Sequence, residues 1–256
     1  DHQAQQEAIQ AELELAPILS PVLQVEELDK EYAENVPFLQ KLPYLKQNYS
    51  GYRKTRGDGN CFYRSYIYSI LEQLTLNQAA QSDSNSLHHQ VYESLLLAVK
   101  RSSAVFDSVG FEAFTYEDFQ EAFIEAVEKT KTQSHDQLVA DFQDQSFADC
   151  LVMYSRFLTS AYLRSNSERF EGFQDGYGSL IEFIRAEVDP MNRESDNLQV
   201  MGLTEALGVR VVIEYLDASA SETCTQMAFP LEYTGPAFEV RLLYRPGHYD
   251  VLYPKV

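Results

Sequence analysis

The chain has 256 residues, 45% of them hydrophobic, including 15 Phe and 17 Tyr. This length and apolar content can fill one large core, so one compact domain is the simplest expectation. The formal net charge of −19 disfavours a nucleic-acid backbone as partner and suits a basic protein. No apolar run approaches the length of a membrane span and no secretory leader is visible, so no membrane association is expected.

The N-terminal segment differs in composition from the rest of the chain. Residues 3–15 are rich in Ala, Gln and Glu with a thin apolar stripe, and Pro17 ends the helix that this spacing predicts. Such a short helix is marginal in isolation. We therefore expect residues 1–30 to form an arm that becomes ordered on a partner, with a disordered tail as the alternative. Further prolines punctuate the chain up to a strand expected near residues 52–55.

The next segment places one thiol between a glycine-rich turn and a helix. Residues 56–61 read Arg-Gly-Asp-Gly-Asn-Cys, and the apolar side chains of residues 62–74 recur at helical spacing. Cys61 therefore lies in the first helical turn, where free amides and the helix dipole stabilise a thiolate. Asp58 and the two residues after it supply the turn and a helix cap. The alternative is a small buried core cysteine.

The middle of the chain is predicted to be helical. Apolar residues at helical spacing mark four segments, namely residues 92–99, 116–129, 147–163 and 179–187. Thr115 and Asp118 resemble a capping pair at a helix start. Residues 197–207 form a further helix that Gly208 ends, and a buried strand follows at residues 209–215.

The C-terminal segment is typical of a β-hairpin. Strands at residues 238–244 and 248–253 flank the turn Arg245-Pro246-Gly247. Alternation along a strand places His248 and Asp250 on one face, where the carboxylate can orient the imidazole. The other ring nitrogen would then accept a proton from a thiol, as in a catalytic triad. An edge hairpin with a solvated His and Asp is the alternative, since the sequence does not show that Cys61 and His248 meet. The order of elements predicts an α+β fold, a small central sheet flanked by helices.

Two separated motifs carry a family resemblance. Residues 54–64 together with residues 244–253 resemble the ovarian-tumour (OTU) family of cysteine deubiquitinases, and within it the otubain subfamily. The resemblance runs from about residue 31 to residue 253. Gly57 stands where that family leads us to expect proline, which leaves the loop more mobile without removing a catalytic group. The stretch 81–90 also fits poorly, which affects only a surface region.

The resemblance implies a papain-like OTU cysteine protease fold, with an OTU catalytic domain at residues 31–256 behind the arm. It implies a thiol isopeptidase that removes ubiquitin from lysine side chains and prefers lysine-48-linked polyubiquitin. Cys61 would attack the carbonyl, His248 would transfer protons and Asp250 would orient His248, with the backbone amides of Asp58 and Cys61 as the oxyanion hole. The enzyme would be a monomer that needs no metal or organic cofactor. The basic tail of ubiquitin suits the acidic chain.

A second hypothesis is a binding protein that inhibits ubiquitin-charged conjugating enzymes without cleaving a bond. One type of otubain is similar in having an N-terminal extension that holds ubiquitin, whereas the other largely lacks it. Candidate surfaces are residues 111–119, 149–157 and 170–175 for the conjugating enzyme and residues 186–197 for ubiquitin. The single residues expected to bind are Phe111, Thr115, Phe170, Phe173, Pro190, Glu194 and Asp196. Each of them is alternatively an ordinary helix-surface or core residue.

Other chemistries are disfavoured by the residues themselves. A cysteine phosphatase needs Arg six residues after the nucleophile, but that position is Ile67. The pairs His88-His89 and His135-Asp136 lack the spacing of a zinc site and are expected at the surface. No nucleotide-binding loop of the GxxxxGK type occurs. Cys150 is expected in the core and Cys224 in a polar loop, so neither is a good nucleophile. Three scattered cysteines indicate a reducing compartment, the cytoplasm and also the nucleus.

Overall fold

The computed structural model describes residues 16–255. Its helices are α2 (Glu27–Glu31), α3 (Val36–Asn48), α4 (Cys61–Leu76), α5 (Gln78–Gln81), α6 (Leu87–Ser108), α7 (Ala113–Lys129), α8 (His135–Gln143), α9 (Gln145–Ser165), α10 (Ser167–Phe170), α11 (Leu180–Phe183), a π-helical continuation η1 (Ile184–Val188) and α12 (Asn197–Leu207). Its strands are β1 (Leu23–Gln24), β2 (Tyr49–Arg53), β3 (Arg210–Tyr215), β4 (Thr225–Phe229), β5 (Glu239–Arg245) and β6 (His248–Pro254). No helix within this part of the chain combines the length and the apolar character that crossing a bilayer requires.

The strands form one sheet in the order β1-β2-β6-β5-β3-β4. All neighbouring pairs are antiparallel except β3 and β5, which run parallel. The predicted hairpin is confirmed, with Arg245 opposite His248 and Leu243 opposite Asp250. Since β6 is paired on both sides, its backbone is held firmly where His248 and Asp250 project.

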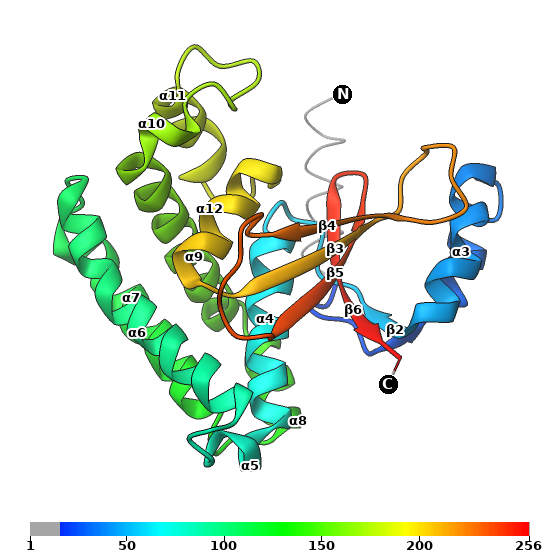
Figure 1. Cartoon of the computed structure of the whole chain (residues 1–256), viewed down its shortest axis with the longest axis horizontal. Coiled ribbons are helices and arrows are strands. Elements are labelled where there is room, and N and C mark those ends of the chain that lie inside the picture. Colours follow the sequence, from blue (N-terminus) through cyan, green and yellow to red (C-terminus); the bar gives the residue numbers. More distant parts are fainter. Residues whose placement is uncertain (1–15, 256) are drawn as a thin grey trace.

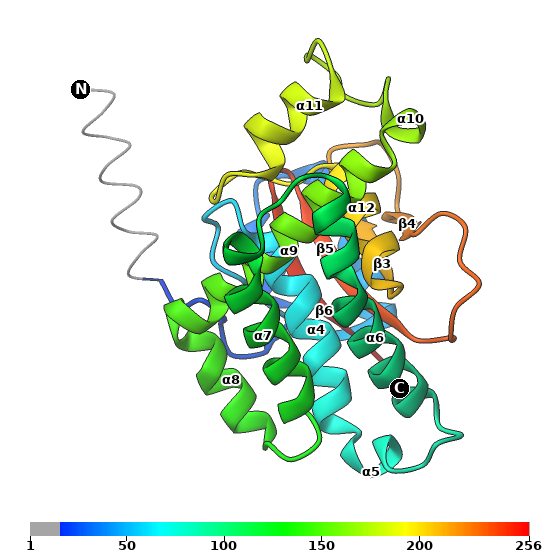
Figure 2. The same cartoon turned by 90° about the vertical axis from the view of Figure 1, so that its left-hand side faces the viewer.

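Helices cover both faces of the sheet (Figure 1). On one face α4 lies against β5 and β6. The helices α8 and α9 pack against α4, and α6, α7 and α12 pack against α9 in the larger hydrophobic core (Figure 2). On the other face α3 covers a smaller core that includes Phe38, Leu42 and Leu45. The expected small sheet between helices is therefore confirmed. The helix α4 is buried on almost all sides, which fixes the position of its first residue, Cys61.

Local capping explains several helix boundaries. The Asp196 side chain and Gln199 form a reciprocal capping box at the start of α12, and Gly208 ends this helix in a left-handed conformation with φ of 68°. The expected helix at residues 197–207 is thus confirmed. The capping pair expected at Thr115 and Asp118 is wrong, because α7 already begins at Ala113 and Thr115 lies inside its first turn.

The N-terminal region is more closely integrated than the sequence indicated. The apolar stripe of residues 3–15 lies outside the described residues. Ile18, Leu19, Val25 and Leu28 are buried, and β1 adds to the edge of the sheet. Part of the expected arm, residues 18–28, therefore packs against the rest of the described structure. The helix α3 was not predicted, because its prolines suggested an irregular segment.

Candidate active site

The helix α4 and the strand β6 bring Cys61 and His248 together. Phe62, next to Cys61, packs edge-on against Tyr249, next to His248, with ring centroids 5.4 Å apart. Cys61 is only 2% exposed, and its side chain lies close enough to the His248 imidazole to raise the pKa of that ring. Two residues that lie far apart in the sequence are therefore neighbours in the fold.

Asp250 holds the imidazole of His248 in one orientation. His248 Nε2 lies 2.8 Å from Asp250 Oδ1, which leaves Nδ1 as the ring nitrogen available to the thiol. Burial lowers the pKa of His248, but its hydrogen bonds to Asp250 and Cys61 outweigh burial and raise the pKa to about 9. An imidazole with this pKa stays protonated at neutral pH, so it can act as a proton donor.

Asp250 is fully buried and has three polar partners. Besides His248, its Oδ1 accepts the backbone N–H of Thr55 at 3.1 Å, and its Oδ2 accepts from Arg245 Nη2 at 2.5 Å. Burial raises the pKa of Asp250, but the hydrogen bond from His248 and the charge of Arg245 outweigh burial and lower it. Asp250 is therefore a fixed carboxylate anion.

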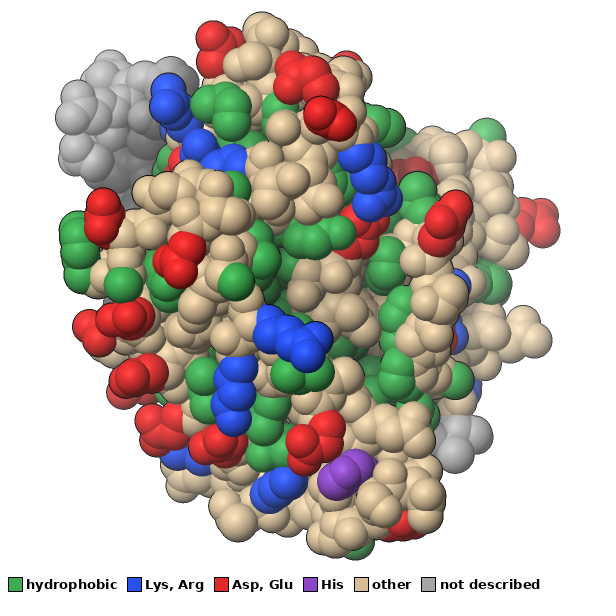
Figure 3. All heavy atoms as spheres, turned by 60° about the vertical axis from the view of Figure 1, so that its left-hand side comes forward, with side chains coloured by type: hydrophobic (Ala, Val, Ile, Leu, Met, Phe, Trp, Pro, Cys, Tyr) green, Lys and Arg blue, Asp and Glu red, His purple; other side chains and the backbone are tan. Residues whose placement is uncertain are grey.

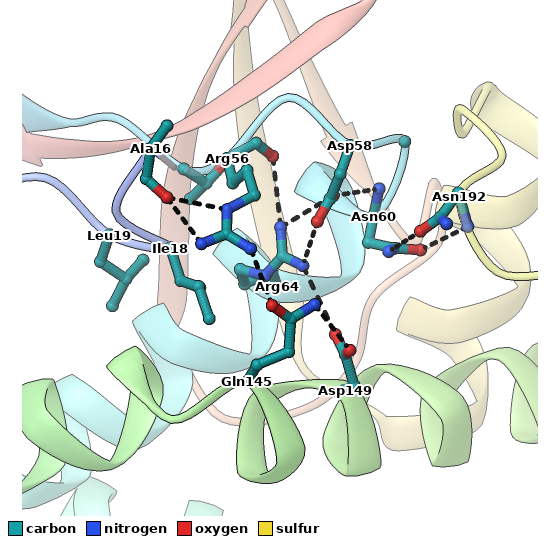
Figure 4. A network of polar contacts seen from close by, with 12 residues as sticks. Ala16, Ile18, Leu19, Arg56, Asp58, Asn60, Arg64, Gln145, Asp149 and Asn192 are labelled. Atoms are coloured by element: carbon teal, nitrogen blue, oxygen red, sulfur yellow. Dashed lines mark hydrogen bonds and ion pairs between the residues drawn. The ribbon is translucent and has the colours of Figure 1, made fainter. Parts of the chain in front are cut away.

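Asp58 organises the loop that precedes the nucleophile (Figure 4). Its carboxylate accepts two hydrogen bonds from Arg64, at 2.9 and 2.7 Å, and one from the backbone N–H of Asn60 at 3.0 Å. Burial raises the pKa of Asp58, and the Arg64 hydrogen bond and charge lower it further than burial raises it. The side chain of Asp58 thus fixes the loop and makes no contact with His248, while its backbone remains next to Cys61.

Arg156 of α9 is a buried anchor that sequence reasoning missed. Its guanidinium donates to Asn60 Oδ1 at 2.9 Å and to the carbonyls of Gly59, Val188 and Arg193, at 3.0, 3.1 and 2.6 Å. It also lies 4.5 Å from the ring centroid of Tyr63. The signal available in the sequence was an arginine on the apolar face of a predicted helix. Arg156 therefore connects residues 58–60, called the catalytic loop from here on, to residues 188–193.

The catalytic loop and residues 188–193 also contact each other directly. Asn60 Nδ2 donates to Asn192 Oδ1 at 2.7 Å, and the Asn192 backbone N–H donates to Asn60 Oδ1 at 3.0 Å. Gly59 has φ of 82°, and a Cβ there would lie 2.5 Å from the Asn192 carbonyl carbon. Only glycine fits this position. The Asn60 side chain does not cap α4, contrary to the expected cap, because it is used in these contacts.

The other two cysteines lack a base. Burial raises the pKa of Cys150, and the carboxylates of Asp149 and Asp118 raise it further. Burial and the Glu214 carboxylate raise the pKa of Cys224 to about 12. Both thiols therefore stay protonated and poorly nucleophilic near neutral pH. Cys224 is buried although a polar loop was expected, because the chain packs it against the smaller core.

The described histidines outside the site, His88, His89 and His135, have structural partners. His135 was expected at the surface, but it is partly buried, and its Nε2 lies 2.8 Å from Glu72 Oε1. Among residues 16–255, no three His, Cys, Asp or Glu side chains are grouped as a metal site would require.

The expected binding residues differ widely in exposure. Phe173 is 62% exposed, whereas Phe170 is fully buried and packs near Tyr162, so Phe170 can support a surface but not contact a partner directly. Phe111 is half-buried against Phe106 and Phe157. Thr115 and Pro190 are half-buried, and Glu194 and Asp196 are exposed.

Three features of these surfaces were not visible in the sequence. Phe114, which was not singled out, is 84% exposed and is the most exposed large apolar side chain among residues 16–255. Hydrophobic side chains also lie between charged ones on the helical side of the molecule (Figure 3). In addition, a Cβ at Gly247 would lie 3.3 Å from the Glu194 carboxylate, so Glu194 lies beside the turn that carries His248.

Comparisons with known proteins agree with this site. Residues 11–254 match the family model for peptidase C65, otubain. The chain is 42% identical over 254 residues to the ubiquitin thioesterase OTUB1 of Homo sapiens, covering 98% of this chain and 88% of the relative. It is 34% identical over 247 residues to the ovarian-tumour-domain deubiquitinating enzyme 1 of Arabidopsis thaliana, covering 89% of this chain and 78% of the relative.

A solved structure of ceOTUB1 in complex with ubiquitin aldehyde and UBC13~Ub superposes with a TM-score of 0.86 at 30% identity. The match covers 98% of this chain and 99% of that one. The resemblance to otubains and the OTU protease fold is thereby confirmed. The chain belongs to the peptidase C65 otubain family and is a cysteine-type deubiquitinating enzyme.

Proposed function

We propose that the chain hydrolyses ubiquitin–lysine isopeptide bonds with Cys61 as the nucleophile, His248 as the general base and acid, and Asp250 as the residue that orients His248. The observation that supports these roles best is the placement of the three side chains. His248 lies between Cys61, the only thiol among residues 16–255 with an imidazole beside it, and the fully buried carboxylate of Asp250. This arrangement matches the geometry that triad chemistry requires.

The reaction follows from these positions. The Cys61 thiolate attacks the isopeptide carbonyl, and protonated His248 then donates its proton to the leaving lysine amine. Neutral His248 removes a proton from water, which attacks the thioester and releases the ubiquitin C-terminus. The backbone amides of Asp58 and Cys61 are proposed to stabilise the oxyanion, where one donor is worth roughly a hundredfold to a thousandfold in rate. The Asp58–Arg64 ion pair and Arg156 keep this loop in place.

Lysine-48-linked polyubiquitin is the proposed substrate, on the strength of the family resemblance. The chain is proposed to act as a monomer in the cytoplasm and nucleus, where its thiols would remain reduced. It needs no cofactor for the steps above.

A ubiquitin probe that carries an electrophile at its C-terminus tests the nucleophile. The unsubstituted chain and the Cys150→Ser and Cys224→Ser variants should all be labelled, and Cys61→Ser should not, because within residues 16–255 only Cys61 has an imidazole beside it. Labelling is measured by mass spectrometry.

Incubation with each diubiquitin type, analysed on a gel, should show cleavage of the lysine-48-linked form. Persistent labelling of Cys61→Ser would contradict the assignment, and equal cleavage of every diubiquitin would contradict the proposed linkage preference.

Inhibition of ubiquitin-charged conjugating enzymes is the second candidate function. Relatives at 31% identity and a TM-score of 0.85 have been solved with ubiquitin aldehyde and UBCH5B~Ub or UBC13~Ub. In this chain, the exposed phenyl rings of Phe114 and Phe173 offer apolar contacts for such a partner. Binding would need no thiolate, so it would be separable from cleavage.

Removing residues 1–15 separates the two functions. A chain that starts at Ala16 keeps the buried side chains of Ile18, Leu19, Val25 and Leu28, so it should fold and react with the ubiquitin probe. If residues 1–15 contact the donor ubiquitin, the truncated chain should inhibit a charged conjugating enzyme at least tenfold less well than the full chain. This is a loss of roughly 1.4 kcal/mol of binding free energy. Inhibition is measured as ubiquitin-chain synthesis with free ubiquitin present.

Two variants serve as controls for the truncation. Cys61→Ser should inhibit fully, because it retains every binding surface, and Phe114→Ala should inhibit less while keeping its reaction with the probe. Equal inhibition by the full and truncated chains would show that residues 1–15 do not contribute.

A further inference from the structure

Arg245 connects the buried carboxylate of the site to the molecular surface. Its Nη2 binds Asp250 Oδ2, the oxygen that His248 does not use. Its Nη1 binds the Glu31 carboxylate at the end of α2 and lies 3.4 Å from the Tyr32 hydroxyl. The Arg245 side chain is 10% exposed and that of Glu31 is 33% exposed. From the surface inward, Glu31, Arg245, Asp250 and His248 therefore carry charges of alternating sign.

Alternating charges of this kind act on the imidazole in opposite directions. Arg245 competes with His248 for the negative charge of Asp250, so the guanidinium weakens the hold of Asp250 on a protonated imidazole. Glu31 offsets part of the Arg245 charge and so strengthens that hold. Asp250 is fully buried, and charges in such surroundings are screened less than surface charges.

We propose that Arg245 and Glu31 are positioning residues that fix the Asp250 carboxylate and adjust how strongly it holds the His248 imidazolium. Arg245 sets the rotation of the carboxylate, because it occupies Oδ2 while Oδ1 accepts from His248 and from the Thr55 backbone. Glu31 sets the net charge on the far side of Arg245. This inference rests on the proposed catalytic roles of His248 and Asp250.

Other charged or titratable groups face the same cluster and stay constant in the experiment. Cys61 and Asp250 face His248, and Glu194 lies beside Gly247 at the turn. Lys54 Nζ binds Glu31 at 2.7 Å. The phenols of Tyr32 and Tyr52 lie within range of the charges of Arg245, Glu31 and Asp250. Because burial raises the pKa of both phenols, they remain neutral.

The titration of the His248 ring tests the proposal without requiring turnover. It is followed by NMR in a Cys61→Ala background, where no thiolate couples to the ring. We expect Glu31→Gln to lower the midpoint and Arg245→Gln to raise it, each by roughly half to one pH unit. Arg245→Lys, which keeps the charge, should restore most of the original midpoint. The His248 resonance is identified by its loss in His248→Gln.

Activity provides a second readout. With Cys61 present, the upper pH limit of diubiquitin cleavage should shift in the same directions as the midpoints. Glu34→Gln is the matched control, since it removes an exposed carboxylate three residues after Glu31. The inference is overturned if Glu31→Gln titrates like Glu34→Gln, or if Glu31→Gln and Arg245→Gln shift the midpoint in the same direction. A failure of the catalytic assignment would instead appear as probe labelling that survives Cys61→Ser.

Discussion

Replacing His248 with alanine is expected to lower diubiquitin turnover by about 10⁴- to 10⁶-fold, the loss seen when a member of a catalytic triad is removed. The variant loses the base proposed to accept the Cys61 thiol proton and the acid proposed to protonate the leaving amine. His248 is partly exposed and is the first residue of β6, so the fold should tolerate the change. Single-turnover cleavage at saturating enzyme, measured on a gel, checks the result.

Two further variants make this test specific. His88→Ala removes a histidine on α6 outside the site and should keep full turnover. Asp250→Asn keeps the size of the buried side chain, and its loss should be roughly tenfold to a hundredfold smaller than that of His248→Ala. Asp250→Ala is a poorer choice, because it would leave the buried Arg245 Nη2 and Thr55 N–H donors without a side-chain acceptor at position 250. Turnover within tenfold of the unsubstituted enzyme in His248→Ala would rule out the proposed chemistry.

Replacing Arg156 with methionine should affect both stability and rate. Methionine fills much of the space but removes the Arg156 donor from the carbonyls of Gly59, Val188 and Arg193, while Asn60 Oδ1 keeps only the Asn192 N–H. Such buried unpaired groups should lower the free energy of unfolding by about 3–5 kcal/mol. The catalytic loop would also shift, and a displacement of roughly 1 Å can cost a hundredfold in rate. Urea unfolding and the rate of probe labelling measure the two effects.

Arg169→Met is the matched control for Arg156. Its guanidinium forms an ion pair with Glu205 and its side chain is 54% exposed, so its removal should cost no more than about 1 kcal/mol. Labelling is compared at a temperature at which both variants are folded. A normal labelling rate in Arg156→Met would show that the catalytic loop holds its conformation without this anchor.

The parts of the site that local patterns specify were predictable. The glycine turn before a helix placed Cys61 correctly, and strand alternation placed His248 and Asp250 on one face. The helix at residues 197–207 followed from its capping residues. These features depend on neighbours within a few residues, which the sequence displays directly.

The parts that depend on distant contacts were not predictable from the pattern. Pro37 and Pro43 argued against a helix at residues 36–48, yet Pro37 occupies the first turn, and the burial of Phe38 and Leu42 outweighs the bond lost at Pro43. Arg156 and Asn192 meet the catalytic loop only through the tertiary fold. The linkage from Glu31 to Asp250 likewise joins residues more than two hundred positions apart.

The point where residues 1–15 join the described structure has a kinetic consequence. Arg56 binds the Ala16 carbonyl at 2.6 Å, and its own carbonyl accepts from Arg64, the partner of Asp58 (Figure 4). Ala16, the first described residue, is therefore connected to the loop that precedes Cys61 through the side chains of Arg56 and Arg64. A ligand held by the preceding segment would be tethered near the catalytic loop, where short linkers give effective concentrations in the millimolar range. A weak contact at residues 1–15 would then suffice to return a dissociated ubiquitin to the site before it diffuses away.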